Sequence, residues 1–190
     1  RSVMKKKEVI LVTDGDQTAS KAIEKASKQL DLRVISKSAG NPTPHSGEEI
    51  LEMIFDCPTD PIIIMFDDQG NLKCGAGELA MKTVIQSSKI DVLGIVAVAS
   101  DSKEVIGVSP DYSVTREGEI VKTPVDKKGE EEMAGHTTLE GDTVDIINEF
   151  NDLLVIGIGD IGKMEGKDSS SKGAPITTKA IKEILKRSGK

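Results

Sequence analysis

The sequence has few aromatic residues, cysteines or histidines. Its 190 residues contain no Trp, one Tyr, three Phe, two Cys and two His. Val, Ile, Leu, Met and Ala must therefore build the hydrophobic core. Cys57 and Cys74 match neither a zinc-binding spacing nor a redox Cys-x-x-Cys motif, so we expect two unpaired thiols. His45 and His136 are too few for a metal site rich in histidine.

Long apolar segments and excess positive charge are also lacking. The longest apolar segment, "VLGIVAVA" at 92–99, is far below the ~20 residues needed to cross a bilayer, so we expect any membrane association to be peripheral. The net charge of −7 argues against a general nucleic-acid-binding protein, although a local basic patch lies near Lys182, Lys186 and Arg187. Residues 1–3 precede Met4, and we interpret them as a cloning remnant.

Short apolar segments alternate with amphipathic helical patterns along the chain. The predicted strands are 9–13, 33–36, 62–66, 92–100 and 153–159. The predicted helices are 19–30, one that starts with a Ser46–Glu49 capping box and stops before Pro58, then 78–88, 142–150 and 177–187. Strands that are apolar on both faces indicate a parallel sheet covered by helices on both sides.

This pattern predicts one α/β domain over residues 4–190, with three layers and a Rossmann-like or flavodoxin-like fold. We expect about five mostly parallel strands, in the order 2-1-3-4-5. Residues 101–141 interrupt the alternation. We interpret them as an insertion at the edge of the domain, with a polar hairpin around Arg116 followed by a charged, mobile loop.

Two pairs of aspartates follow predicted strands. Asp14 and Asp16 come directly after the first strand, and Asp67 and Asp68 after the third. Ligands of such sheets bind beyond the carboxyl ends of the strands, where the strand order reverses, so all four carboxylates are predicted to meet in one crevice. Because unpaired carboxylates repel one another, Mg²⁺ or Ca²⁺ is a possible ligand there. The competing interpretation is that these residues only form turns and helix caps.

Later strand ends add three candidate ligand-binding residues to this crevice: Ser100, Asp160 and Lys163. The motif "DGDQT" has the Asp-x-Asp-x-Thr form of haloacid dehalogenase phosphatases, in which Asp14 would be the nucleophile and Asp16 the general acid and base. No lysine has a clear phosphate-stabilising role, and no room is left for the flap of that family.

Two further interpretations fit less well. A response-regulator site would use the same aspartates, but the long insertion does not suit that compact fold, and a Toprim site would need a Glu-Gly that the first strand lacks. Gly157, Gly159 and Gly162 form a Gly-x-Gly-x-x-Gly motif after a strand. A dinucleotide-binding site would need a helix directly after the motif and another strand beyond it, and a Ser- and Gly-rich loop follows instead.

Several long strings resemble the stage V sporulation protein AE family of spore-forming Firmicutes, in particular its soluble member encoded in the stage V A operon. They are "SAGNPTP", "MFDD", "GIGDIGKM" and "GAPIT", and the resemblance runs from Met4 to the C-terminus. It implies a non-enzymatic accessory protein of sporulation and germination, acting with the machinery that moves calcium dipicolinate across the inner spore membrane. The implied partners are membrane or dipicolinate-binding proteins of the same operon, and the implied place is peripheral, at that membrane.

Overall fold

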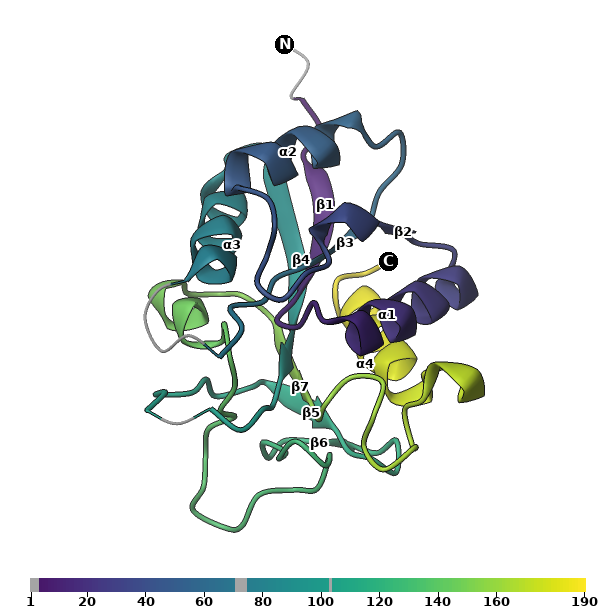
Figure 1. Ribbon diagram of the computed structural model, residues 1–190, viewed down its shortest axis with the longest axis vertical. Coiled ribbons are helices and arrows are strands. Elements are labelled where there is room, and N and C mark those ends of the chain that lie inside the picture. The colour runs from purple at the N-terminus through teal and green to yellow at the C-terminus, as the bar shows by residue number, and fades with distance from the viewer. Residues whose placement is uncertain (1–3, 71–74, 103) are drawn as a thin grey trace.

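The computed structural model describes residues 4–70, 75–102 and 104–190, so Cys74 lies outside the described residues. One sheet contains seven strands in the order β2-β3-β1-β4-β7-β5-β6 (Figure 1). The strands are β1 Lys7–Val12, β2 Arg33–Val34, β3 Ile62–Met65, β4 Ile90–Val98, β5 Tyr112–Val114, β6 Ile120–Val121 and β7 Val155–Ile158. All neighbours are parallel except β5 and β6, which confirms the predicted open, mostly parallel α/β sheet.

The predicted strand order is wrong in one respect. The five predicted strands are ordered 2-3-1-4-5, because β1 lies between β3 and β4 rather than between β2 and β3. The nine-residue β4 pairs with β1 from Lys7 to Val12, which makes β1 a central strand. The two-residue β2 is partly exposed and occupies the edge. The neighbouring positions of β1 and β3, on which the predicted crevice depends, are nevertheless confirmed.

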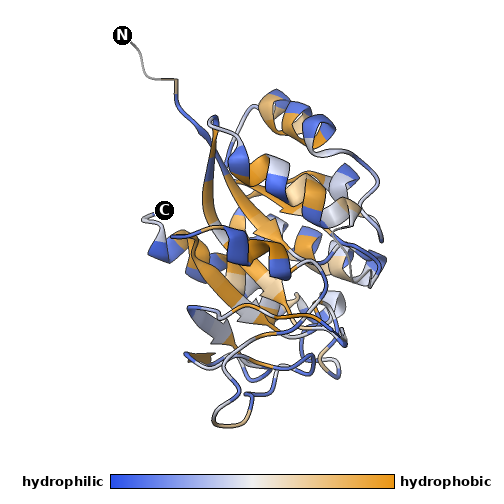
Figure 2. Cartoon of the chain, turned by 90° about the vertical axis from the view of Figure 1, so that its left-hand side faces the viewer, coloured by the Kyte–Doolittle hydropathy of each residue, from blue (hydrophilic) through white to orange (hydrophobic). Residues whose placement is uncertain are grey.

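The helices form the two outer layers. Helices α1 Gln17–Leu30 and α4 Pro175–Arg187 cover one face of the sheet, and α2 Gly47–Asp56 and α3 Ala76–Gln86 cover the other (Figure 1). Figure 2 shows that the strands are predominantly hydrophobic. Alternate residues of β1 point to opposite sides, so that Val9 and Leu11 join one core and Ile10 and Val12 the other. No helix in the described part of the chain is long and apolar enough to span a bilayer.

The helix predicted over 142–150 is instead a short 3-10 segment, Asp145–Glu149. Its β-branched residues have low helix propensity. The Asp145 carboxylate also accepts hydrogen bonds from the backbone N–H groups of Ile106 and Gly107, at 3.0 and 2.8 Å. These bonds hold the segment against a neighbouring loop. Two further 3-10 segments are Ser36–Ser38 and Ser170–Lys172.

Two local predictions are confirmed. The hairpin expected around Arg116 is formed by β5 and β6, and β5 also pairs with β7, so the hairpin extends one edge of the sheet. The capping box at the start of α2 is present, with Ser46 accepting from the Glu49 N–H at 3.2 Å and Glu49 accepting from the Ser46 N–H at 3.3 Å.

Candidate functional site

The carboxyl ends of β1 and β3 bring Asp14 and Asp67 together. Both side chains accept a hydrogen bond from the same Gly15 N–H, at 2.8 Å for Asp14 Oδ1 and 3.2 Å for Asp67 Oδ2. Both aspartates are buried. Gly15 fits here because it has no side chain, since a Cβ would lie 2.9 Å from the carbonyl oxygen of Gly40. The tight turn after β1 therefore allows two carboxylates to share one donor.

Burial and mutual repulsion disfavour ionisation of this pair. Burial raises the pKa of Asp14 well above its ordinary value, and the charges of Asp16, Asp67 and Asp160 raise it further. Burial also raises the pKa of Asp67, against the lowering effect of hydrogen bonds from Gln69 and Gly15. We call Asp14, Asp16, Asp67 and Asp160 the carboxylate cluster. Its electrostatics favour a proton or a cation.

Asp160 and Lys163 form the more exposed side of the cluster. Asp160 follows β7, and its Oδ2 lies 3.4 Å from Lys163 Nζ. Burial raises the pKa of Asp160, and the ammonium group of Lys163 opposes this. The pKa of Lys163 is raised by Asp160, then by Asp16 and Asp14, so this lysine faces the cluster. The structure thus brings five of the seven candidate residues into electrostatic contact.

Asp16 and Asp68 also have structural roles. Asp16 is the N-cap of α1 and accepts from the Ala19 N–H at 2.8 Å. Asp68 is 1% exposed. Its oxygens accept from the N–H groups of Gly77 and Glu78 at the start of α3 and from the Thr143 hydroxyl, at 2.7, 3.2 and 2.8 Å. For Asp68, the structure therefore shows a helix cap with both oxygens occupied.

Ser100 takes part in a separate set of contacts beyond β4. Its hydroxyl accepts from the Asp142 N–H at 3.0 Å and lies 3.2 Å from the Ser102 hydroxyl, which donates to the Asp142 carboxylate. Asp142 in turn raises the pKa of Asp67. Ser100 is thus linked to the carboxylate cluster through Asp142.

Ligand atoms from Asp14, Asp16, Asp67 and Asp68 do not form a compact set of three. Within the described ranges, Glu132, His136 and Glu140 each place one potential ligand atom within 4.8 Å of the other two. A cation bound by the four aspartates would therefore require side-chain rearrangement. The Glu-His-Glu group was not among the predicted site residues, although its i, i+4, i+8 spacing is visible in the sequence.

Asp168 is a second residue that the sequence did not single out. It is fully buried, and its carboxylate accepts hydrogen bonds from the N–H groups of Gly162, Ile176 and Thr177 and from the Thr177 hydroxyl, at 2.6–2.9 Å. It therefore satisfies the N-terminus of α4 from within the preceding loop. An Asp eight residues before a helical Ile is a weak signal, because capping residues normally lie closer to the helix start.

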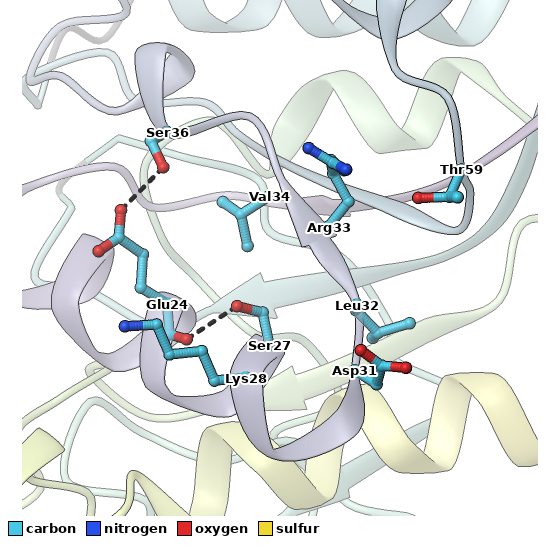
Figure 3. A pocket seen from close by; sticks show the side chains of 9 residues that line it. All are labelled: Glu24, Ser27, Lys28, Asp31, Leu32, Arg33, Val34, Ser36 and Thr59. Atoms are coloured by element: carbon cyan, nitrogen blue, oxygen red, sulfur yellow. Dashed lines mark hydrogen bonds between the residues drawn. The ribbon is translucent and has the colours of Figure 1, made fainter.

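Cavities of the described residues also lie away from the cluster, and two of them flank α1 and α4. One, of about 440 Å³, lies along α1 and β2, where Glu24 accepts hydrogen bonds from Ser36 and Ser27 (Figure 3). None of the predicted site residues lines it. The other, of about 670 Å³, lies beside α4 and has three half-buried apolar residues, Leu30, Ile120 and Leu185. Four lysines surround it, namely Lys179, Lys182, Lys186 and Lys190, and we call them the lysine stripe.

Comparison with known families identifies the chain. A family model described as Stage V sporulation protein AE1 matches residues 8–188. The chain belongs to this family. Comparisons with curated proteins and with solved structures find no match. Membership confirms the resemblance seen in the sequence and assigns a sporulation-related role.

Proposed function

We propose that this family member is a non-enzymatic accessory protein of sporulation and germination, held peripherally at the inner spore membrane. There it would act with the calcium dipicolinate transport machinery, through membrane or dipicolinate-binding proteins of the same operon. Membership of the Stage V sporulation protein AE1 family supports a role in sporulation. The observation that carries the membrane attachment is the lysine stripe.

Three members of the lysine stripe are exposed on α4, and Lys190 follows the helix. Lys179, Lys182 and Lys186 follow one another at i, i+3 and i+7, a spacing that places them on one helix face. Lys179 donates to the carbonyl oxygen of Gly118, and Lys190 lies 2.5 Å from Glu8. Among the described residues, Lys182 and Lys186 have no ion-pair partner. Two exposed ammonium groups are therefore available to an outside partner.

An anionic lipid surface suits this combination of charge and apolar floor. Basic residues near such a surface contribute about 1 kcal/mol each. Their methylene stems can lie along apolar surface while the charged ends reach phosphate groups. Glu183, the acidic residue beside the cavity, is paired with Arg187 at 2.8 Å. Because the whole chain has a net charge of −7, attraction to an anionic membrane must come from a local patch.

The structural roles of two acidic residues support a non-enzymatic role. The phosphatase interpretation assigns proton transfer to Asp16, but Asp16 accepts from the Ala19 N–H as the cap of α1. Asp68, one of the four predicted metal ligands, has both oxygens occupied by donors.

Vesicle co-sedimentation tests the membrane attachment. We expect the full chain to bind phosphatidylglycerol vesicles at low salt, to bind phosphatidylcholine vesicles much less, and to dissociate as salt screens the charges. Lys182→Glu with Lys186→Glu should weaken binding at least tenfold. Lys21→Glu with Lys25→Glu, at exposed positions on α1, is the matched control and should change binding little. Equal binding to both lipids, or equal loss in both double variants, would refute the assignment.

A second candidate function has one specific observation in its favour. Asp14 and Asp67 share a donor and both have raised pKa values, which suits a magnesium-dependent phosphohydrolase-like or phosphoryl- or metal-binding domain using Asp14, Asp16, Asp67 and Asp68. Hydrolysis of p-nitrophenyl phosphate with Mg²⁺, compared with Asp14→Asn, tests it. If the protein is a non-enzymatic accessory protein, Asp14→Asn should leave any observed hydrolysis unchanged. A rise in melting temperature with millimolar Mg²⁺ or Ca²⁺ that Asp14→Asn removes would instead favour metal binding.

A further inference from the structure

We propose that Glu132, His136 and Glu140 form a binding site for a borderline divalent cation such as Zn²⁺. One ligand atom from each residue lies within 4.8 Å of the other two. His136 Nε2 lies 2.8 Å from Glu140 Oε1, and His136 Nδ1 lies 3.4 Å from Glu132 Oε2. The imidazole is therefore flanked by two carboxylates from one loop.

The spacing of these atoms suits a small tetrahedral ion. Zinc lies about 2.0–2.2 Å from nitrogen and oxygen ligands, so two ligands of a tetrahedral site are roughly 3.3 Å apart. The 3.4 Å between His136 Nδ1 and Glu132 Oε2 is close to that value. Zinc would bind one ring nitrogen, and a side-chain rotation would bring the second carboxylate to the same ion. The three residues would then hold the ion and leave a fourth position open.

Backbone contacts with the rest of the fold hold the three residues in place. The Glu132 N–H donates to the carbonyl oxygen of Pro124 at 3.0 Å, and the Glu140 carbonyl oxygen accepts from the Ser100 N–H after β4 at 3.0 Å. The His136 N–H closes a turn on the carbonyl oxygen of Met133 at 3.0 Å. The loop between Glu132 and Glu140 is thus anchored at both ends, so little conformational entropy is lost when an ion binds.

A supporting hydrogen bond and an adjoining cavity complete the site. The Thr138 hydroxyl donates to Glu140 Oε1 at 3.1 Å, the kind of outer contact that orients a ligating carboxylate. Glu132 and Glu140 line a cavity of about 250 Å³ that also contains Lys127. The cavity leaves room for water or another small ligand at the open coordination position.

The donor set selects the metal. One imidazole with two carboxylates suits Zn²⁺ and similar transition-metal ions, whereas Ca²⁺ and Mg²⁺ prefer sites made only of oxygen. The site is therefore chemically distinct from the carboxylate cluster, which contains only aspartates. It also does not depend on membrane attachment, so the two proposals can fail separately.

Calorimetric titration of the full chain with ZnCl₂, in buffer free of phosphate and chelator, tests the site. We expect one Zn²⁺ per chain with micromolar affinity and a higher melting temperature. His136→Gln and Glu140→Gln should each weaken binding at least tenfold. The matched control is His45→Gln, because His45 forms a similar pair with Glu49 at 3.2 Å but has no second carboxylate partner among the described residues. This variant should bind zinc as the original chain does.

Imidazole NMR of the unmodified chain provides a test that needs no variant. Added Zn²⁺ should shift the ring nitrogens of His136 and leave those of His45 unchanged. The proposal is overturned if zinc leaves the His136 ring unaffected, if His45→Gln weakens binding as much as His136→Gln, or if Ca²⁺ binds as tightly as Zn²⁺. The first result would mean that His136 is held only as a protonated partner of the two glutamates.

Discussion

The acidic carboxyl edge of the sheet and the lysine stripe of α4 carry opposite charges, and they also differ in how their charges are satisfied. At the carboxyl edge, Asp68 and Asp168 accept hydrogen bonds from helix N-termini and nearby hydroxyl groups. On the stripe, Lys182 and Lys186 have no ion-pair partner within the described residues. A charge bound by its own backbone serves folding, whereas an exposed charge without a partner is available to another molecule.

The carboxylate cluster lies between these two cases. Asp14 and Asp67 are also buried, but they share one N–H donor and repel each other. They add to the cost of folding, in contrast to the caps, and they favour a proton or a cation. Each of the following substitutions tests whether a given charged side chain stabilises the fold or is available to bind another molecule.

The largest expected effect follows removal of Asp168. Asp168→Ala would leave the buried N–H groups at the start of α4 without their acceptor, and we expect the free energy of unfolding to fall by roughly 3–5 kcal/mol. Urea denaturation measures this. Asp160→Ala, in the same loop but partly exposed, is the control and should cost little. Equal losses in the two variants would contradict the distinction.

Removal of Asp68 should have the next largest effect. Asp68→Ala takes the acceptor away from the first turn of α3 and from the Thr143 hydroxyl, so we expect a loss of roughly 2–3 kcal/mol. A double-mutant cycle with Thr143→Val should give a coupling energy of about 1 kcal/mol. If Asp68→Ala left the free energy of unfolding unchanged, Asp68 would not be a stabilising cap. Its predicted role as a metal ligand would then regain support.

Asp14→Asn should stabilise the protein at neutral pH. Burial in the native state raises the pKa of Asp14 above its ordinary value of 3.8. At pH values between the unfolded-state pKa and the native-state pKa, the native state binds more protons than the unfolded chain, so stability falls as the pH rises. The neutral amide removes this penalty. We expect a gain of about 1 kcal/mol, or about 2–4 °C in melting temperature, at pH 7. The gain should disappear as the pH falls towards 4, and a gain that persists there would require another cause.

The smallest effect on stability is expected on the stripe. Lys182→Ala with Lys186→Ala removes two exposed side chains that have no ion pair among the described residues, so the free energy of unfolding should change by less than about 0.5 kcal/mol. Urea denaturation and vesicle binding should be measured on the same preparation. Loss of vesicle binding with unchanged stability would separate the stripe from the folding charges, whereas loss of stability would place it among them.

The sequence predicted the strands and four of the five helices well, because their signals are local. Alternating apolar segments, the Ser46–Glu49 box and the turn at Arg116 all depend on nearby residues. Strand order depends on pairing between distant segments, which periodicity does not encode, and so β1 and β3 were predicted in each other's positions.

The prediction of the site was also limited by its dependence on contacts between distant segments. Strand ends located Asp14, Asp67 and Asp160, but whether a carboxylate caps a helix or faces a neighbour depends on tertiary contacts. Asp67 and Asp68 are adjacent in the chain and have opposite roles, because Asp68 accepts from α3 and Asp67 faces Gly15. His136 was set aside because histidines are few, although its ring lies between two glutamates.

Spores whose only copy of the gene encodes Lys182→Glu with Lys186→Glu test the central claim most directly, beside spores that carry Lys21→Glu with Lys25→Glu. The measurements are the amount of the protein in the inner-membrane fraction and the dipicolinate content and release of the spores. Our account predicts that only the stripe variant leaves the membrane fraction, at unchanged total level, and that its spores accumulate or release dipicolinate more slowly. A stripe variant that leaves the membrane while dipicolinate movement stays normal would contradict the account.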